Sequence, residues 1–228
     1  MSLIAIIGDI HGCINTLKSI YPKLKEKTSE IYSVGDLIDR GPDAKAVVQF
    51  CLDNDIKCVR GNHEDILLKV IGEEPDRPFI SRADRVENHI RNGGDITIRS
   101  YTGNPEIDID EYRKSLEETG HLEYIKSFPL KIEFDGVIIS HAGLAEGTDD
   151  VIWHRKAAKK LTKLQVFGHT PVPKIDFNSG WYANIDTGCV YADRGLGTLT
   201  AIVVDSINGE VEEFISQKNV GEYTDQKA

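Results

Sequence analysis

A chain of 228 residues can form one large domain or two small ones around a substantial core. With 40% hydrophobic and 28% charged residues, the composition is that of a folded globular protein and excludes an intrinsically disordered chain. The formal net charge of −10 argues against a nucleic-acid-binding protein that works by neutralising many phosphates.

The N-terminus and the cysteines indicate a cytoplasmic protein. The apolar run at residues 3–7 is too short for a signal peptide or a membrane span, and no basic residue precedes it. The four cysteines lack CxxC spacing and do not resemble a disulfide framework. We therefore expect a cytoplasmic location and no membrane partner. No feature of the sequence indicates an oligomeric state.

The first 71 residues alternate strand and helix patterns. Pro22 lies within the first helical pattern and is expected to kink or interrupt it. The alternating order predicts a parallel sheet with right-handed crossovers, whose ligands bind beyond the carboxyl ends of the strands. The expected strands are 3–7, 31–34 and 56–59. Three helices are expected: one that begins near Asn15, one at 44–52 and one at 64–71.

Residues 72–127 form a helical insert. Asn92-Gly93-Gly94 predicts a break, and Gly120 can interrupt the last helical stretch. The insert is either a cap beside the site or a solvated excursion, and we favour the cap. The expected elements are a loop at 73–78 and helices at 81–92 and 110–126.

After Phe128-Pro129 the pattern is mostly that of strands. Asp135-Gly136 predicts a hairpin turn, and the polar tail after Gln217 is expected to fray. We expect one catalytic domain over residues 1–217, with the insert at about 72–127, and a tail at 218–228. The expected strands are 130–134, 137–140, 164–167, 182–185, 198–204 and 211–215, with a helix at about 149–161.

Candidate metal ligands follow the predicted strands. Asp9 and His11 come just after the first strand and, two residues apart in extended backbone, can face one ion. A lone Asp or His in such a place is usually structural, but six of them make a shared metal site the better interpretation. Carboxylate, imidazole and amide ligands together suit manganese, iron or zinc better than calcium or magnesium. The six residues are Asp9, His11, Asp36, Asn62, His141 and His169.

The loop Gly35-Asp36-Leu37-Ile38-Asp39-Arg40-Gly41 presents two carboxylates and a guanidinium between two glycines. Glycine lets the backbone bend sharply and approach a ligand closely. The composition of the loop predicts one carboxylate that bridges metal ions, a second with a different task, and an arginine that binds an anion.

These motifs resemble the phosphoprotein phosphatase (PPP) family of metallophosphoesterases over about residues 3–204. The likeness is closest to the bacterial and phage Ser/Thr phosphatases and to the related symmetrical dinucleoside tetraphosphatases. The resemblance implies an α/β calcineurin-like metallophosphoesterase fold, with two packed mixed β-sheets flanked by helices and a helical cap insert. The motifs are Gly8-Asp9-Ile10-His11-Gly12, the 35–41 loop, Gly61-Asn62-His63-Glu64, His141-Ala142-Gly143 and Gly168-His169-Thr170, with Asn92-Gly93-Gly94, Trp153-His154-Arg155 and residues 184–191 as further matches.

The resemblance implies two divalent transition-metal ions, with Mn²⁺ expected and Fe, Zn, Ni or Co as alternatives. Asp36 would bridge the two ions, and the pair would activate a water for in-line attack on phosphorus without a covalent phospho-enzyme. The other ligands would be Asp9 and His11 on the first ion, and Asn62, His141 and His169 on the second.

The resemblance also implies the remaining roles. His63 would protonate the leaving oxygen, and Asp39 would orient it and favour its imidazolium form. Arg40 and Arg155 would bind the phosphoryl oxygens together with Asn62. The alternative for Arg155 is a solvated helix arginine.

Two positions bear on the branch of the family. Pro171 occupies the place where Gly-His-x-His nucleases and phosphodiesterases carry another ligand, which indicates a phosphatase. A longer loop at 192–197 departs from the bacterial pattern and leaves substrate contacts near Tyr191 and Arg194 undetermined.

The predicted activity is hydrolysis of phosphomonoesters, with phosphoserine and phosphothreonine in proteins as substrates. The alternative is symmetrical hydrolysis of diadenosine tetraphosphate to two ADP. A non-catalytic binding module on the same fold is disfavoured, since every ligand and the proton donor are present.

Overall fold

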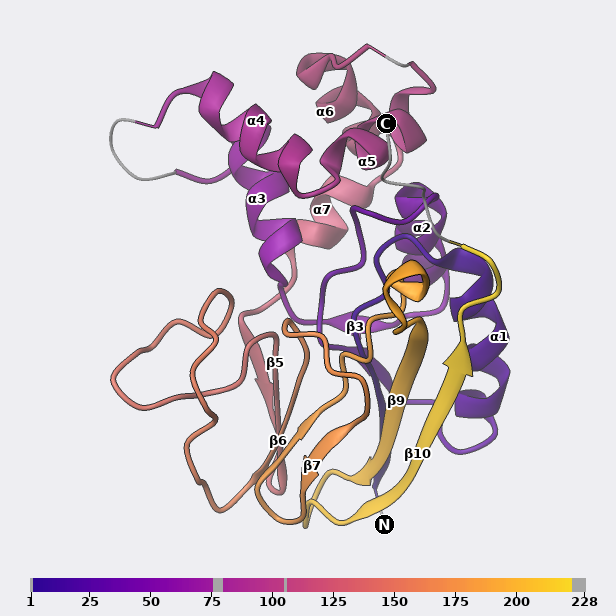
Figure 1. Ribbon diagram of the computed structural model, residues 1–228, viewed down its shortest axis with the longest axis vertical. Coiled ribbons are helices and arrows are strands. Elements are labelled where there is room, and N and C mark those ends of the chain that lie inside the picture. The colour runs from indigo at the N-terminus through magenta and orange to yellow at the C-terminus, as the bar shows by residue number, and fades with distance from the viewer. Residues whose placement is uncertain (1, 76–79, 105, 223–228) are drawn as a thin grey trace.

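The computed structural model describes residues 2–75, 80–104 and 106–222 and packs two mixed β-sheets against each other (Figure 1). In the described residues the first sheet has the order β10-β9-β1-β2-β3 and the second has the order β4-β5-β6-β8-β7. The strands are β1 (Leu3–Ile7), β2 (Ile31–Ser33), β3 (Lys57–Cys58), β4 (Lys131–Glu133), β5 (Val137–Ser140), β6 (Leu164–Phe167), β7 (Asp176–Asn178), β8 (Tyr182–Asn184), β9 (Thr198–Asp205) and β10 (Val211–Lys218).

The alternation along β1 shows that the first sheet is covered on both faces. Ala5 and Ile7 belong to the core shared with the helices, whereas Ile4 and Ile6 belong to the core shared with the second sheet. A central strand with two covered faces is a continuous apolar run, as residues 3–7 are. The predicted α/β fold of two packed sheets is confirmed.

The strands β1 and β2 pair in parallel, as do β2 and β3, which confirms the parallel sheet predicted for the first half of the chain. The connections carry α1 (Ile14–Lys25) and α2 (Ala44–Asp53). The predicted interruption at Pro22 is wrong, because α1 continues to Lys25. Pro22 lies in the last turn, where its missing N–H deprives only one carbonyl of a hydrogen bond.

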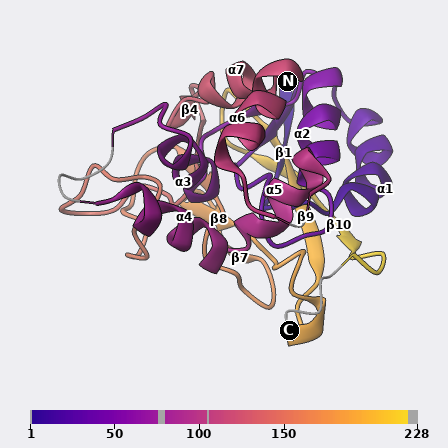
Figure 2. The same cartoon turned by 90° about the horizontal axis from the view of Figure 1, so that it is seen from above.

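The insert follows α3 (Asn62–Val70), and its helices gather at one end of the molecule, beyond the strands (Figures 1 and 2). Gly93, with φ 89°, ends one helix as predicted, but the next begins directly at Gly94, a helix that the sequence did not indicate. The predicted loop at 73–78 is described only as far as Pro75, and its remainder lies outside the described residues. The helices are α4 (Arg82–Arg91), α5 (Gly94–Thr102), α6 (Ile109–Glu118) and α7 (His121–Lys126).

The helix predicted at about 149–161 is wrong. The segment is an irregular loop held by an isolated bridge between Ala145 and Ala158. Asp150 Oδ1 accepts hydrogen bonds from the backbone N–H groups of Ile152 and Trp153. Such local bonds from an Asp side chain offer the backbone an alternative to a helix.

The predicted fraying after Gln217 is also wrong as far as Glu222, because β10 continues to Lys218 and the carboxylate of Glu222 is buried against α1. It accepts hydrogen bonds from the N–H groups of Asn15 and Thr16 and from the Thr16 hydroxyl. A carboxylate at a helix N-terminus accepts hydrogen bonds from the free N–H groups and interacts favourably with the helix dipole. The rest of the predicted tail lies outside the described residues.

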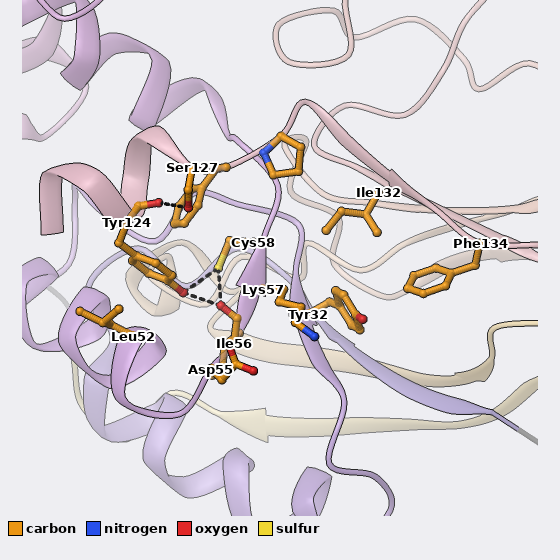
Figure 3. A pocket seen from close by; sticks show the side chains of 12 residues that line it. Tyr32, Leu52, Asp55, Ile56, Lys57, Cys58, Tyr124, Ser127, Ile132 and Phe134 are labelled. Carbon is orange, nitrogen blue, oxygen red and sulfur yellow. Dashed lines mark hydrogen bonds between the residues drawn. The ribbon is translucent and has the colours of Figure 1, made fainter. Parts of the chain in front are cut away.

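An apolar hollow lies apart from the loops that carry the candidate site residues. It is a cavity of about 520 Å³ between β3, α7 and β4, lined by Tyr124, Phe128 and Ile132 among others (Figure 3). None of the residues that line it is a candidate site residue. Among the described residues, no helix combines the length and the apolar character needed to cross a bilayer.

Candidate metal centre

The structure brings all six candidate ligands together at the carboxyl ends of strands from both sheets. Asp9 and His11 follow β1, Asp36 follows β2, and Asn62 begins α3 after β3. His141 and His169 follow β5 and β6 of the second sheet. All six side chains are buried although all are polar, which requires that their polar atoms find partners within the cluster.

Asp36 lies at the centre of the cluster. Its Oδ2 is 3.4 Å from His141 Nε2, 3.6 Å from His11 Nε2 and 3.8 Å from His63 Nε2. Its Oδ1 accepts a hydrogen bond from the backbone N–H of His63 at 3.1 Å. One carboxylate therefore faces histidines from both sheets, which is the placement that a bridging ligand needs.

Two glycines make this close packing possible. A Cβ atom on Gly168 would lie 1.9 Å from Asp9 Oδ1, and one on Gly61 would lie 2.1 Å from Asp36 Oδ1. Any side chain at either position would displace a candidate ligand. These contacts explain the glycines of the Gly168-His169-Thr170 and Gly61-Asn62-His63-Glu64 motifs.

Backbone carbonyls orient the three candidate histidine ligands. His11 Nδ1 donates to Ile38 O, His141 Nδ1 donates to Val34 O, and His169 Nε2 donates to Trp153 O. Each bond fixes the tautomer and leaves the lone pair of the other ring nitrogen directed into the cluster. The irregular loop at 149–161 therefore contributes the Trp153 carbonyl, which in a regular helix would accept an intrahelical hydrogen bond instead.

The lone pairs of His141 and His169 face other acceptors. His141 Nε2 and His169 Nδ1 are 3.2 Å apart, and Asn62 Oδ1 lies 2.9 and 2.8 Å from them. Acceptors at such distances, with no proton between them, repel one another, and a cation among them would remove this repulsion. Nitrogen and carboxylate donors from Asp9, Asp36 and His141, and from His11, Asp36 and His63, also lie within 4.8 Å of one another in each group. The donor set fits divalent transition metals.

Burial raises the pKa values of the carboxyl groups in the cluster. The pKa of Asp36 rises to about 7 because burial disfavours the ionised form, although the Arg40 guanidinium lowers it in part. The pKa of Asp9 is raised well above its usual range by burial and by the neighbouring charges of Asp186 and Asp36. Arg40 also donates from Nη1 to His11 Nε2 at 2.7 Å, so its charge compensates part of the negative charge.

Divalent metal is expected to raise the melting temperature more at about pH 7.5 than at about pH 5. Burial raises the pKa of Asp36 from its ordinary value of 3.8 to about 7, so the metal-free protein loses stability through this group as pH rises from about 4 to about 7. A bound cation offsets this loss only where the carboxylates are ionised. Thermal unfolding with and without Mn²⁺ at both pH values measures the effect. Equal shifts at the two pH values would contradict it.

His63 and Asp39 form a buried pair beside the cluster. His63 Nδ1 is 2.6 Å from Asp39 Oδ2, and both side chains are fully buried. His63 Nε2 has no hydrogen-bond partner among the described residues. Burial, with the charge of Arg40, holds the pKa of His63 well below its usual range. The contact with Asp39 orients the ring and opposes this effect, because a neighbouring carboxylate favours the imidazolium form.

Arg155 lies at the exposed rim of the site. Its Nη1 donates to the Thr170 hydroxyl at 3.4 Å, next to His169. Its charge contributes to lowering the pKa of His169 to about 3, of which burial is the main cause. Arg155 follows the loop residue Trp153 and is not part of a helix.

The sequence analysis assigned no role to four further buried residues. Glu64 accepts hydrogen bonds from the N–H groups of Asp36, Leu37 and Gly61 and so holds the two metal-site loops together. The carboxyl group of Asp186 lies beside Asp9 and has its pKa raised to about 6 by burial. Glu64 and Asp186 lie within the family motifs of the sequence, and this position was the available signal for their role. Thr97 and His89 of the insert contact Asp39.

Comparison with known proteins agrees with this geometry. A family model described as calcineurin-like phosphoesterase matches residues 2–196. The symmetrical bis(5'-nucleosyl)-tetraphosphatase of Erwinia tasmaniensis is 34% identical over 119 residues, which cover 48% of this chain and 40% of that protein. The match therefore spans less than half of that relative's length.

Two further likenesses extend over most of the chain. Serine/threonine-protein phosphatase 1 of Salmonella typhimurium is 27% identical over 215 residues, which cover 83% of this chain and 88% of that protein. A crystal structure described as that of a candidate diadenosine tetraphosphatase has a TM-score of 0.63 at 22% identity and covers 96% of this chain and 95% of that one. The structural likeness supports the fold.

Proposed function

Because the chain belongs to the calcineurin-like phosphoesterase family, we propose that it hydrolyses phosphate monoesters, with phosphoserine and phosphothreonine in proteins as its substrates. The protein is a metallophosphoesterase, and the choice of substrate is the proposal. The similarity to a Ser/Thr phosphatase over 88% of that protein supports it. We also propose that residues 1–217 act as one catalytic domain in the cytoplasm.

The observation that carries the proposal is the buried Asp39–His63 pair, whose Nε2 has no hydrogen-bond partner within the described ranges. The alkoxide that leaves a phosphoserine is strongly basic and needs a proton as the P–O bond breaks. The ADP that leaves a dinucleoside tetraphosphate is weakly basic and needs little help. A proton donor built into the protein core therefore suits a phosphomonoester.

The proposed mechanism assigns metal binding, phosphate binding and proton donation to different residues. Two divalent metal ions, which we propose to be Mn²⁺, would polarise the phosphoryl group and lower the pKa of a water. The residues that would hold them are Asp9, His11, Asp36, Asn62, His141 and His169, and Asp36 would serve both ions. Arg40, Arg155 and the Asn62 amide bind the phosphoryl oxygens, and His63 Nε2 gives its proton to the leaving oxygen while Asp39 orients the ring.

Hydrolysis of dinucleoside tetraphosphates is the second candidate. The Erwinia relative bears the name of such an enzyme. A cavity of about 290 Å³ adjoins Gly168 and Thr170, and its lining includes Arg155, Lys156 and Trp181. Cationic and aromatic side chains together can hold a nucleotide.

Product analysis decides between the two candidates. The protein loaded with Mn²⁺ is incubated with a phosphoserine peptide and, separately, with diadenosine tetraphosphate, and the products are separated by ion-exchange chromatography. We expect inorganic phosphate from the peptide at the higher kcat/KM. Rapid formation of two ADP, or of ATP and AMP, with negligible peptide turnover would favour the second candidate. Bound metal without turnover of either substrate or of p-nitrophenyl phosphate would indicate a binding module.

A further inference from the structure

Asp39 needs support because its backbone is in a strained conformation. Its φ of 68° is in the left-handed region, which costs a non-glycine residue free energy that its surroundings must offset. Its carboxyl group is fully buried, and burial raises its pKa. Hydrogen-bond donors from elsewhere in the fold stabilise both this conformation and the ionised carboxylate.

The hydroxyl of Thr97 supplies that support. It accepts a hydrogen bond from the backbone N–H of Asp39 at 2.9 Å and donates its own proton to Asp39 Oδ1 at 2.7 Å. A hydroxyl has only one proton, so both roles are fixed by these two contacts. Oδ1 is thereby occupied, and Oδ2 is left for His63 Nδ1 at 2.6 Å.

The glycine pair at the start of α5 brings Thr97 to this position. The carbonyl of Gly93 accepts a hydrogen bond from the N–H of Arg40 at 3.2 Å, which joins the insert to the residue after Asp39. A Cβ atom on Gly94 would lie 2.3 Å from His89 Nδ1, so only glycine lets the ring fit there. His89 Nδ1 in turn lies 3.6 Å from Asp39 Oδ2. The insert therefore encloses the Asp39 carboxylate from two sides.

We propose that Thr97 is the positioning residue of the proton donor, so that the insert completes the catalytic site by orienting Asp39 and, through it, His63. The inference rests on the proposed phosphomonoesterase function. The Thr97 hydroxyl bonds to Asp39, and in the described part of the chain it forms no hydrogen bond with any of the six candidate ligands. It holds Asp39 so that the His63 ring directs Nε2 at the leaving oxygen, which receives the Nε2 proton as its bond to phosphorus breaks.

The test replaces the hydroxyl while keeping the shape of the side chain. Thr97→Val removes both hydrogen bonds, and Thr97→Ser retains the hydroxyl. The matched control is Thr102→Val on the same helix, whose hydroxyl donates to Ile98 O and does not contact Asp39. Thr97→Ala accompanies Thr97→Val, so that an outcome remains measurable if the valine variant does not fold. Metal content and melting temperature are measured for every variant.

We expect Thr97→Val and Thr97→Ala to lower kcat for a phosphoserine peptide by about tenfold to a hundredfold, since general acid catalysis contributes roughly 10²–10⁴-fold. Turnover of p-nitrophenyl phosphate should change much less, because nitrophenolate leaves without a proton. Thr97→Ser and Thr102→Val should leave the ratio of the two rates unchanged, and metal content should stay that of the wild type.

Equal losses for both substrates, or no loss, would overturn the inference and indicate a purely structural threonine. If the wild-type protein hydrolyses neither substrate, the proposed function fails first and the inference fails with it. A wild-type protein that is active on both substrates, with variants that lack the selective loss, overturns only the role of Thr97.

Discussion

Asp36→Asn is expected to abolish binding of both metal ions together and to lower kcat/KM by at least about a thousandfold, which corresponds to about 4 kcal/mol of transition-state stabilisation. Asp36 Oδ2 faces His141 of the second sheet and His11 of the first, so loss of its charge affects both groups of ligands. The amide keeps the shape of the side chain, which separates the effect of charge from that of packing. Elemental analysis of the purified variant and a phosphatase assay provide the measurement.

The control for this variant is Asp110→Asn, which makes the same chemical change at an exposed residue paired with Arg82. It should retain the wild-type metal content and activity. An Asp36→Asn protein that retains one ion would show that Asp36 serves a single site. An unchanged content of both ions would remove Asp36 from the ligand set.

His63→Asn is expected to leave the metal content nearly intact and to lower kcat by about 10²–10⁴-fold for a phosphoserine peptide. The loss should be smaller for p-nitrophenyl phosphate, because its leaving group departs without a proton. His63 Nε2 is 3.8 Å from Asp36 Oδ2 and has no hydrogen-bond partner in the described part of the chain, as expected of a group that acts on substrate. Kinetics with both substrates and elemental analysis check the prediction.

A buried histidine of the insert is the matched control for this change. His121 is also fully buried, but its ring contacts Tyr101 and Gln49 away from the metal cluster. His121→Asn should lower the melting temperature without changing the ratio of the two substrates' rates. Loss of metal from His63→Asn would show that the residue is a ligand and that its assignment as proton donor is wrong.

Errors in the predicted elements arose where local signals and tertiary contacts disagreed. Apolar residues and charges at 149–161 suggested a helix, but Asp150 caps the following N–H groups, and the Trp153 carbonyl accepts a hydrogen bond from His169. The glycines at 93 and 94 mark a break as predicted, but the helix that begins at Gly94 had no signal, and the packing of Gly94 against His89 explains why this first residue is glycine. At 149–161 the contact with His169, sixteen positions from Trp153, adds to the local bonds of Asp150 and outweighs the helical pattern.

The amino-acid sequence by itself determined the fold class and the convergence of the six candidate ligands. Short apolar strands alternating with helices require a parallel sheet, and the carboxyl ends of parallel strands meet at one edge, so that Asp9 and Asp36 had to lie near each other. Family motifs extended this to His141 and His169 in the second sheet.

The surroundings of the proton donor were decided only by the tertiary structure. Thr97 is separated from Asp39 by 58 positions and belongs to no pattern that signals chemistry. Its hydroxyl reaches Asp39 because a helix of the insert packs over the metal-site loop. A hydrogen bond depends on atomic distances, and spacing along the chain does not fix such distances between elements that meet only through packing.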